Sequence, residues 1–170
     1  MKEIRTLGMV LHPRRDSAPA MSTILAWAAD RGVTVMGLAE EVGRLDCTAL
    51  AVSAATMADR ADMLVALGGD GTVLRAMRLS DRHQAPVLGV NLGKLGFLAE
   101  VDIADLPGAL AAIGDGNYHI EVRTALDAAV GSRSSPLSTP SSSCGYPARE
   151  AQLWTSPSRV NTSSAMPRTP

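Results

Sequence analysis

The sequence predicts an α/β fold, with an open, mostly parallel sheet and flanking helices. Three observations support this fold class. Short apolar runs alternate with helical patterns along residues 1–130. The clearest apolar run, at 62–69, has the character of a buried strand. Glycines such as Gly32 and Gly93 stand where these elements should stop. Strand–helix alternation of this kind is typical of a parallel sheet covered by helices.

The first half of the domain contains two expected strands and one clear helix. Residues 6–12 form a short apolar run that ends at Pro13. Residues 17–31 place apolar side chains at helical spacing, and Gly32 is a helix stop signal. Residues 33–38 then predict a second strand. The stretch 39–60 is ambiguous, apart from a short helix expected at 54–60.

The second half repeats the alternation with stronger signals. A strand at 62–69 leads into a helix at 72–81, and a strand at 85–93 ends at Gly93. A helix is expected at 104–116. The last expected element is a strand that begins with alternating residues, within 118–130.

Composition narrows the classes of protein. Hydrophobic residues make up 46% of the 170 residues, enough for a core, and the net charge of -1 gives no sign of nucleic-acid binding. Cys47 and Cys144 are too far apart to suggest a zinc site or a disulfide framework. No segment has the composition of a signal peptide or a membrane helix. We therefore expect a cytoplasmic protein with no membrane partner.

Residues 131–170 differ from the rest of the chain. They contain 11 Ser residues and 6 of the 10 Pro residues, with few apolar positions and no visible period. Such a segment is expected to be disordered, because it cannot bury enough surface to offset its ordering entropy. The abrupt change also suggests the hypothesis that this tail is read out of frame, which sequencing the gene around codons 130–136 would test.

The stretch "VALGGDGTVLRAM" at 65–77 predicts a ligand site. Gly68, Gly69, Gly71 and Thr72 should lie at the carboxyl end of a parallel strand, where such sheets bind ligands. Glycines allow close approach of a ligand and unusual backbone conformations, and a helix start favours phosphate. The carboxylate of Asp70 would repel phosphate, so it should meet a hydroxyl or a hydrated Mg²⁺. The alternative is that Asp70 caps the helix at Thr72.

Two motifs resemble those of NAD kinases. "GGDGT" at 68–72 is shared with diacylglycerol-type lipid kinases and, more loosely, with phosphofructokinases; "PVLGVNLGKLGFLAEV" at 86–101 is similar to NAD kinases more specifically. The resemblance covers residues 1 to about 130 and implies a Rossmann-like N-terminal domain. It also implies phosphorylation of the adenosine ribose 2′-hydroxyl of NAD to give NADP. ATP or polyphosphate would be the donor, with Mg²⁺ or another divalent cation, in a homo-oligomer.

The resemblance assigns roles to four residues. Asp70 matches the acid that accepts the proton of the ribose hydroxyl, and Asp70 and Gly71 match positions that contact NAD. Arg75 matches a basic position that contacts NAD, or is a solvated helix residue. Phe97 would wall the adenine pocket, or belong to the core.

Other residues are assigned no chemistry. Asn91 and Gly93–Gly96 are expected to shape their loop, and no metal site is assigned to the chain's own residues. The three histidines match no catalytic position: His12, His83 and His119.

The sequence also departs from the resemblance. NAD kinases have a second, β-rich domain that completes the NAD site, and residues 131–170 show neither its Asn–acid pair nor its Thr/Gly/Ser-rich segment. We therefore expect an N-terminal NAD kinase domain that is weakly active or inactive alone. The alternatives are a lipid or other small-molecule kinase that shares the turn, and a non-catalytic nucleotide-binding remnant.

Overall fold

A computed structural model gives the structure of the protein. It describes residues 3–43, 45, 47–80, 83–93, 96–130, 133–137 and 148–155, and from residue 124 onward it describes the backbone only.

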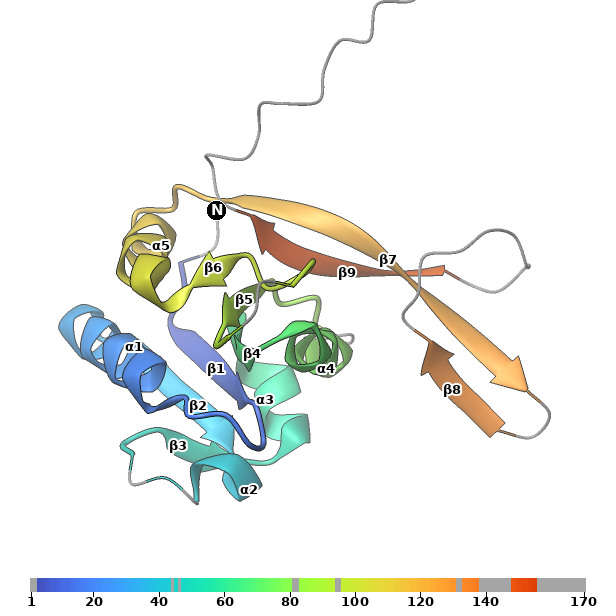
Figure 1. Ribbon diagram of the computed structural model, residues 1–170, viewed down its shortest axis with the longest axis horizontal. Helices are drawn as coiled ribbons and strands as arrows, with labels where there is room; N and C mark the ends of the chain where they lie inside the picture. The colour runs from blue at the N-terminus through green and yellow to red at the C-terminus, as the bar shows by residue number, and fades with distance from the viewer. Residues whose placement is uncertain are drawn as a thin grey trace, which may run out of the picture.

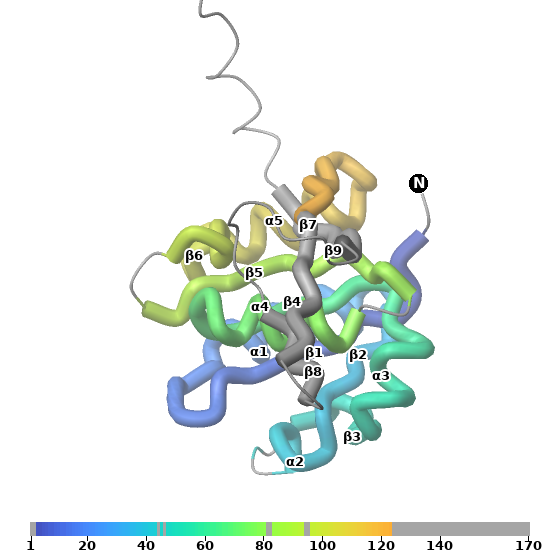
Figure 2. The backbone as a smooth tube through the Cα atoms, turned by 90° about the vertical axis from the view of Figure 1, so that its right-hand side faces the viewer, coloured from blue at the N-terminus to red at the C-terminus, as the bar shows by residue number. Residues whose placement is uncertain are grey.

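Five parallel strands form the main part of the sheet, which confirms the predicted fold class (Figure 1). Their spatial order is β3-β2-β1-β4-β5, with β4 between β1 and β5. Figure 2 follows the same strands from β3, low in the view, up to β5. The bounds are β1 Thr6–Leu11, β2 Thr34–Leu38, β3 Leu50–Val52, β4 Met63–Gly68 and β5 Val87–Asn91.

Helices cover both faces of this sheet. On one face, α1 (Ala18–Arg31) and α5 (Leu106–Gly114) pack on one buried cluster of apolar side chains. On the other face, α3 (Ala54–Arg60) and α4 (Asp70–Ser80) pack on a second cluster. Every residue of β4 is buried, because β4 lies between the two clusters. The strand predicted at 62–69 is therefore confirmed as a fully buried interior strand.

The helix boundaries follow local signals closely at some ends and less closely at others. The predicted stop at Gly32 is confirmed, since Gly32 closes α1 in a left-handed conformation with φ 67°. The expected helix at 54–60 is also confirmed as α3, where the Ser53 hydroxyl accepts the N–H of Thr56 at 3.2 Å. By contrast, α4 begins at Asp70, earlier than the predicted residue 72.

The ambiguous stretch 39–60 contains two further short elements. Helix α2 spans Ala39–Val42 and strand β3 spans Leu50–Val52 at the edge of the sheet. Leu50 is exposed and β3 is only three residues long, so it lacks the buried character of the inner strands. A short 3₁₀ turn, η1 (Ile103–Asp105), precedes α5.

The sheet continues beyond β5 with strands of both directions. Strand β6 (Val101–Asp102) pairs with β5, and β7 (His119–Val130) pairs antiparallel with β8 (Arg133–Leu137) and β9 (Ala148–Thr155). Strands β8 and β9 lie where we expected no regular structure. Main-chain pairing along β7 accounts for this difference, because backbone hydrogen bonds between strands do not require alternating apolar side chains. The remaining residues of 131–170 lie outside the described residues, so their disorder and reading frame stay predictions.

The end of β4 holds the two loops beside it. The carbonyl oxygen of Leu67 accepts the N–H of His12 at 2.9 Å, and the carbonyl oxygen of Gly68 accepts the N–H of Leu92 at 3.2 Å. His12 follows β1 and Leu92 follows β5. The loops that leave β1 and β5 are thereby fixed around the start of α4.

Gly89 in β5 lets the following loop cross back over its own strand. A Cβ atom at Gly89 would lie 2.9 Å from both the Cα atom of Ala99 and the carbonyl oxygen of Leu98. These neighbours are backbone atoms, so they cannot rotate away as a side chain would.

We predict that Gly89→Ala lowers the free energy of unfolding by about 1–3 kcal/mol, the usual range for overpacking. The matched control is Gly108→Ala in α5, where an added Cβ meets nothing within 4 Å. That change should be neutral or raise stability by up to about 1 kcal/mol, because alanine favours helix. Urea denaturation followed by circular dichroism measures both, and equal effects at the two positions would contradict this account.

Candidate functional site

Three segments meet at the carboxyl edge of the sheet. They are the turn from β4 into α4, the loop from β1 into α1, and the loop that follows β5. The "GGDGT" turn runs from Gly68, the last residue of β4, through Gly69 into the first turn of α4. The predicted position of this turn is therefore the observed one.

The carboxylate of Asp70 binds the loop that follows β5. One oxygen accepts the N–H of Phe97 at 3.0 Å, and the other accepts the N–H groups of Leu98 at 3.0 Å and Ala99 at 3.4 Å. Asp70 is the first residue of α4, and no described N–H of that helix donates to its side chain. The alternative that Asp70 caps the helix at Thr72 is therefore wrong.

The same contacts set the protonation of Asp70. Partial burial by itself would raise the pKa of this carboxyl, but the N–H donors of Leu98, Phe97 and Ala99 outweigh that effect and lower the pKa below its ordinary value. The start of α4 adds a favourable helix dipole. Asp70 is therefore a weak base and a firmly held anion.

The glycines of the turn fall into two kinds. A Cβ atom at Gly68 would collide with the side chain of Thr72, so the strand end and helix start can pack only with glycine there. At Gly69 and Gly71 an added Cβ meets nothing within 4 Å, and neither residue has a positive φ. The expectation of unusual backbone conformations is wrong for this turn. Open space beside the backbone is what Gly69 and Gly71 provide.

Two glycines of the loop after β5 make room for charged side chains from other segments. A Cβ atom at Gly96 would overlap the carboxylate of Asp70, and one at Gly93 would overlap the guanidinium of Arg15. The buried amide of Asn91 donates to the carbonyl of Gly93 at 3.0 Å and accepts its N–H at 3.0 Å. Asn91 thus shapes the loop as expected.

Phe97 lies on the surface of this loop. Its side chain is 92% exposed, so the alternative that it belongs to the core is wrong. Its N–H is held by Asp70, which leaves the ring directed away from the packed interior. A role for Phe97 at an adenine pocket stays a prediction.

Arg75 is held by partners from two other elements. Its guanidinium lies 2.6 Å from the carboxylate of Glu41 and donates to the carbonyl oxygen of Leu11 at 2.5 Å. Glu41 is only 3% exposed, and its other oxygen accepts the N–H of Leu11 at 2.7 Å. The alternative of a freely solvated Arg75 is therefore wrong, while its contact with NAD stays a prediction.

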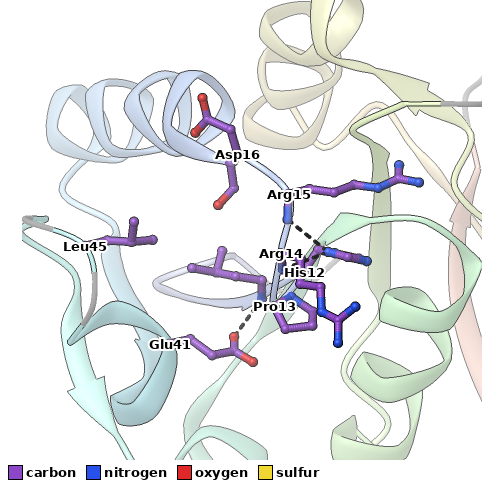
Figure 3. A pocket seen from close by; sticks show the side chains of 9 residues that line it. His12, Pro13, Arg14, Arg15, Asp16, Glu41 and Leu45 are labelled. Atoms are coloured by element: carbon purple, nitrogen blue, oxygen red, sulfur yellow. Dashed lines mark hydrogen bonds between the residues drawn. The ribbon is translucent and has the colours of Figure 1, made fainter.

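The loop after β1 is the part of the site that sequence reasoning missed. The ring nitrogen Nδ1 of His12 accepts the N–H groups of Arg14 and Arg15, both at 3.1 Å, and so folds the loop (Figure 3). The sequence pattern alone predicts no role for His12. The available signal was a histidine, a proline and two arginines directly after an apolar strand, which places cations at the ligand-binding edge.

Two cavities flank this loop. One has a volume of about 400 Å³ and is lined by His12, Pro13, Arg15, Gly69, Gly71, Thr72 and Arg75. The other, of about 300 Å³, lies toward α2 and is lined by residues of the loop together with Glu41 and Leu45 (Figure 3). The predicted phosphate-approach residues thus line the first cavity, except Gly68.

The described residues do not fit a Mg²⁺ site of their own. They contain no cluster of three or more His, Cys, Asp or Glu side chains, and both carboxylate oxygens of Asp70 already accept N–H groups. Across the same part of the chain, no helix has the length and apolar character needed to span a membrane.

We predict that Asp70→Asn destabilises the fold in a pH-dependent way. The lowered pKa means that the carboxylate contributes stability above its unfolded-state pKa, near 3.9, and that this contribution is lost as pH falls through the folded-state pKa. At pH 7 the substitution should cost about 1–3 kcal/mol, because an amide accepts fewer N–H groups. At about pH 2–3 the cost should shrink. Urea unfolding at both pH values measures it; a cost that does not change with pH would contradict the role of the charge.

We predict that Arg75→Met lowers the free energy of unfolding by about 3 kcal/mol, because it leaves the buried carboxylate of Glu41 without its cation. The control is Arg78→Met, one turn later on the exposed face of α4, which should change stability by no more than about 0.5 kcal/mol. Thermal and urea unfolding compare the two variants. Similar losses would show that the ion pair is not what matters.

Comparisons with known proteins agree with this geometry. The family model described as "ATP-NAD kinase N-terminal domain" matches residues 7–118. The NAD kinase of Desulforamulus reducens is 34% identical over 128 residues, which are 75% of this chain and 44% of that protein. The NAD kinase of Serratia proteamaculans is 38% identical over 133 residues, 76% of this chain and 45% of that protein. The chain thus spans less than half the length of these relatives.

A solved structure shares the fold. The crystal structure of yeast NADH kinase complexed with NADH matches with a TM-score of 0.64 and 22% identity, over 75% of this chain and 40% of that chain. The family match covers strands β2 to β6 and nearly all of β1, together with the "GGDGT" turn and the loop held by Asp70. The chain therefore belongs to the NAD kinase family, of which it carries the N-terminal domain.

Proposed function

We propose that this protein is an NAD kinase that phosphorylates the adenosine ribose 2′-hydroxyl of NAD to give NADP, with ATP or polyphosphate as donor. The observation that carries the proposal is the juxtaposition of an ionised Asp70 with open backbone at Gly69 and Gly71. A hydroxyl acceptor and a phosphate approach would then lie side by side at one sheet edge.

Asp70 would orient the hydroxyl rather than remove its proton early. A carboxylate has about four lone-pair positions, and three N–H groups already occupy Asp70, so one position remains for a hydroxyl donor. Its lowered pKa makes early proton removal unfavourable. Phosphoryl transfer has a loose transition state, so positioning contributes more than basicity. A proton that leaves late is consistent with a weak base.

The neighbouring residues would complete one wall of the site. The ring of Phe97, which is exposed, would meet the adenine, and Gly71, which has open space beside its backbone, would contact NAD. Arg75 would act from its fixed position against Glu41. A divalent cation would find its ligands among the donor's phosphate oxygens, since the described residues do not fit a site for it.

Activity of residues 1–170 alone should be low. The described site residues all come from one sheet edge, so a bound NAD would be held from one side only. Positioning can account for about 7–11 kcal/mol of a barrier in well-oriented systems. The expected homo-oligomer and the cytoplasmic location stay predictions.

The lipid-kinase alternative shares the "GGDGT" turn but not the more specific motif that follows β5, whereas a non-catalytic remnant is distinguished only by an activity assay. The loop "NLGKLGFLAE" belongs to the matched region 7–118, which favours NAD as the acceptor. Calorimetric binding of NAD and of diacylglycerol to the 170-residue protein separates these acceptors without requiring turnover.

We predict that a chimera of residues 1–118 with the remaining part of the Desulforamulus reducens NAD kinase forms NADP from NAD, and that Asp70→Asn lowers its kcat about 10²-fold or more with a smaller change in KM. Arg78→Gln is the matched control and should leave both constants unchanged. A folded chimera that forms no NADP, or an Asp70→Asn variant with the parent's kcat, would overturn the proposal.

A further inference from the structure

The loop from β1 into α1 is folded on the ring of His12. Nδ1 of this ring accepts the N–H groups of Arg14 and Arg15, both at 3.1 Å (Figure 3). The residue is itself fixed to the sheet, because its own N–H donates to the carbonyl oxygen of Leu67 at 2.9 Å. A Cβ atom added at Gly68 would lie 3.2 Å from the Cβ atom of His12, so His12 also packs closely on the end of β4. The ring is therefore a fixed support to which two hydrogen bonds hold the loop.

The residues that follow His12 account for this use of its ring. Pro13 has no N–H group, and a proline favours an extended backbone in the residue before it. The next two N–H groups along the chain then need an acceptor close to residue 12. Asparagine and aspartate supply such an acceptor in Asx turns, through a side-chain oxygen bonded to Cγ. Nδ1 of histidine is also bonded to Cγ, so His12 takes the place of an asparagine here.

A histidine differs from an asparagine in this place because it can gain a proton. Nδ1 accepts hydrogen bonds only while it is unprotonated, so the folded loop requires a neutral ring with its proton on Nε2. A second proton turns Nδ1 into a donor that faces two N–H donors, and both hydrogen bonds are lost. The open loop thus binds one proton more than the folded loop. A fall in pH therefore favours the open loop.

The charged groups of the same loop do not relieve this conflict. Arg14 and Arg15 are cations, which add positive charge beside a protonated ring. The carboxylate of Asp16 accepts the N–H of Ala18 at 2.9 Å and is directed away from the ring of His12 (Figure 3). In the described part of the chain, no group forms a hydrogen bond with Nε2 of His12.

The charged groups of the neighbouring elements are also engaged elsewhere. Glu41 of α2 and Arg75 of α4 each line a cavity with His12, and they form an ion pair with each other. The carboxylate of Asp70, at the start of α4, accepts N–H groups of residues 97–99. A protonated His12 would therefore find no counter-ion among the described groups. Only rotation of the ring or movement of the loop relieves the conflict at Nδ1, and either one breaks both hydrogen bonds.

We propose that His12 is a pH-sensitive switch for the loop from β1 into α1. Its neutral ring holds the loop folded, with Arg14 and Arg15 at the carboxyl edge of the sheet, and its protonated ring releases the loop. The switch is a property of the fold and needs no ligand. Only its effect on activity rests on the proposed function, since the loop lines the same cavity as Gly69 and Gly71.

The test is NMR spectroscopy of the ¹⁵N-labelled 170-residue protein from about pH 8 to about pH 5, the range in which histidine rings usually change charge. Ring nitrogen shifts report the protonation of His12. Amide hydrogen exchange, corrected for the intrinsic effect of pH on exchange, reports the two hydrogen bonds. At the upper end of the range, the N–H groups of Arg14 and Arg15 should be protected. As the ring gains its second proton, the protection of both should fall at least about 10-fold, as expected for lost hydrogen bonds.

Two variants and one control separate the switch from a general effect of acid. His12→Asn keeps an acceptor on Cγ that gains no proton, so Arg14 and Arg15 should stay protected across the range. His12→Ala removes the acceptor, so their protection should be low throughout. His83→Asn is the matched control; it removes a ring that contacts the side chain of Asp59, and it should respond to pH like the parent. Circular dichroism first establishes that each variant is folded. If His12→Ala does not fold, the comparison of the parent with His12→Asn decides.

The inference is overturned if the ring of His12 stays neutral down to about pH 5, or if Arg14 and Arg15 stay protected when the ring is protonated. It is also overturned if His12→Asn loses protection as the parent does. In the NAD kinase chimera, kcat/KM for NAD should fall with pH more steeply in the parent than in His12→Asn. A chimera that forms no NADP overturns the proposed function, while exchange in the 170-residue protein still decides the switch. Equal pH dependence of the two chimeras overturns only the link from the switch to activity.

Discussion

The carboxylate of Asp70 is the contact on which the candidate site depends. It joins the first residue of α4 to the backbone of a loop 27 to 29 residues away in sequence. Because it accepts main-chain N–H groups, it fixes the path of the loop backbone directly. The ring of Phe97 is exposed as a consequence of this path, and Gly96 has no side chain because the carboxylate occupies that space.

The second constraint is the end of β4, which forms hydrogen bonds with the loops that follow the strands on both sides of it. Its last carbonyl groups bind the loops after β1 and β5, and α4 begins directly after it. Arg75 of α4 donates a hydrogen bond to the carbonyl oxygen at the end of β1 and forms an ion pair with Glu41 of α2. Three segments far apart in sequence are thereby held at one edge, and a ligand would meet a surface that is organised before it binds. Such preorganisation is what positioning catalysis requires.

Much of the fold could be predicted from sequence because its signals are local. The apolar run predicts β4, and Gly32 predicts the end of α1. Each signal lies within or next to the element that it predicts. The misses share a different cause. Strand β9 depends on pairing with β7, and the exposure of Phe97 depends on a bond from a distant helix. The ion pair of Arg75 depends on a glutamate in a stretch whose structure was ambiguous. None of these partners lies near its residue in sequence, so no window along the chain contains the information.

The glycines of the two motifs have two different roles: some are needed for packing, and others leave open space beside the backbone. In sequence the glycines of the two motifs are equivalent, since each permits close approach. In the structure Gly68, Gly93 and Gly96 are filled by Thr72, Arg15 and Asp70, so their small size is already used within the protein. Gly69 and Gly71 alone, among the described glycines of these motifs, leave an added Cβ with nothing within 4 Å, and both line the 400 Å³ cavity. This open space is where the phosphate approach of the proposed function would lie. Gly68, Gly93 and Gly96 therefore allow the three segments to pack closely, whereas Gly69 and Gly71 leave space beside the backbone.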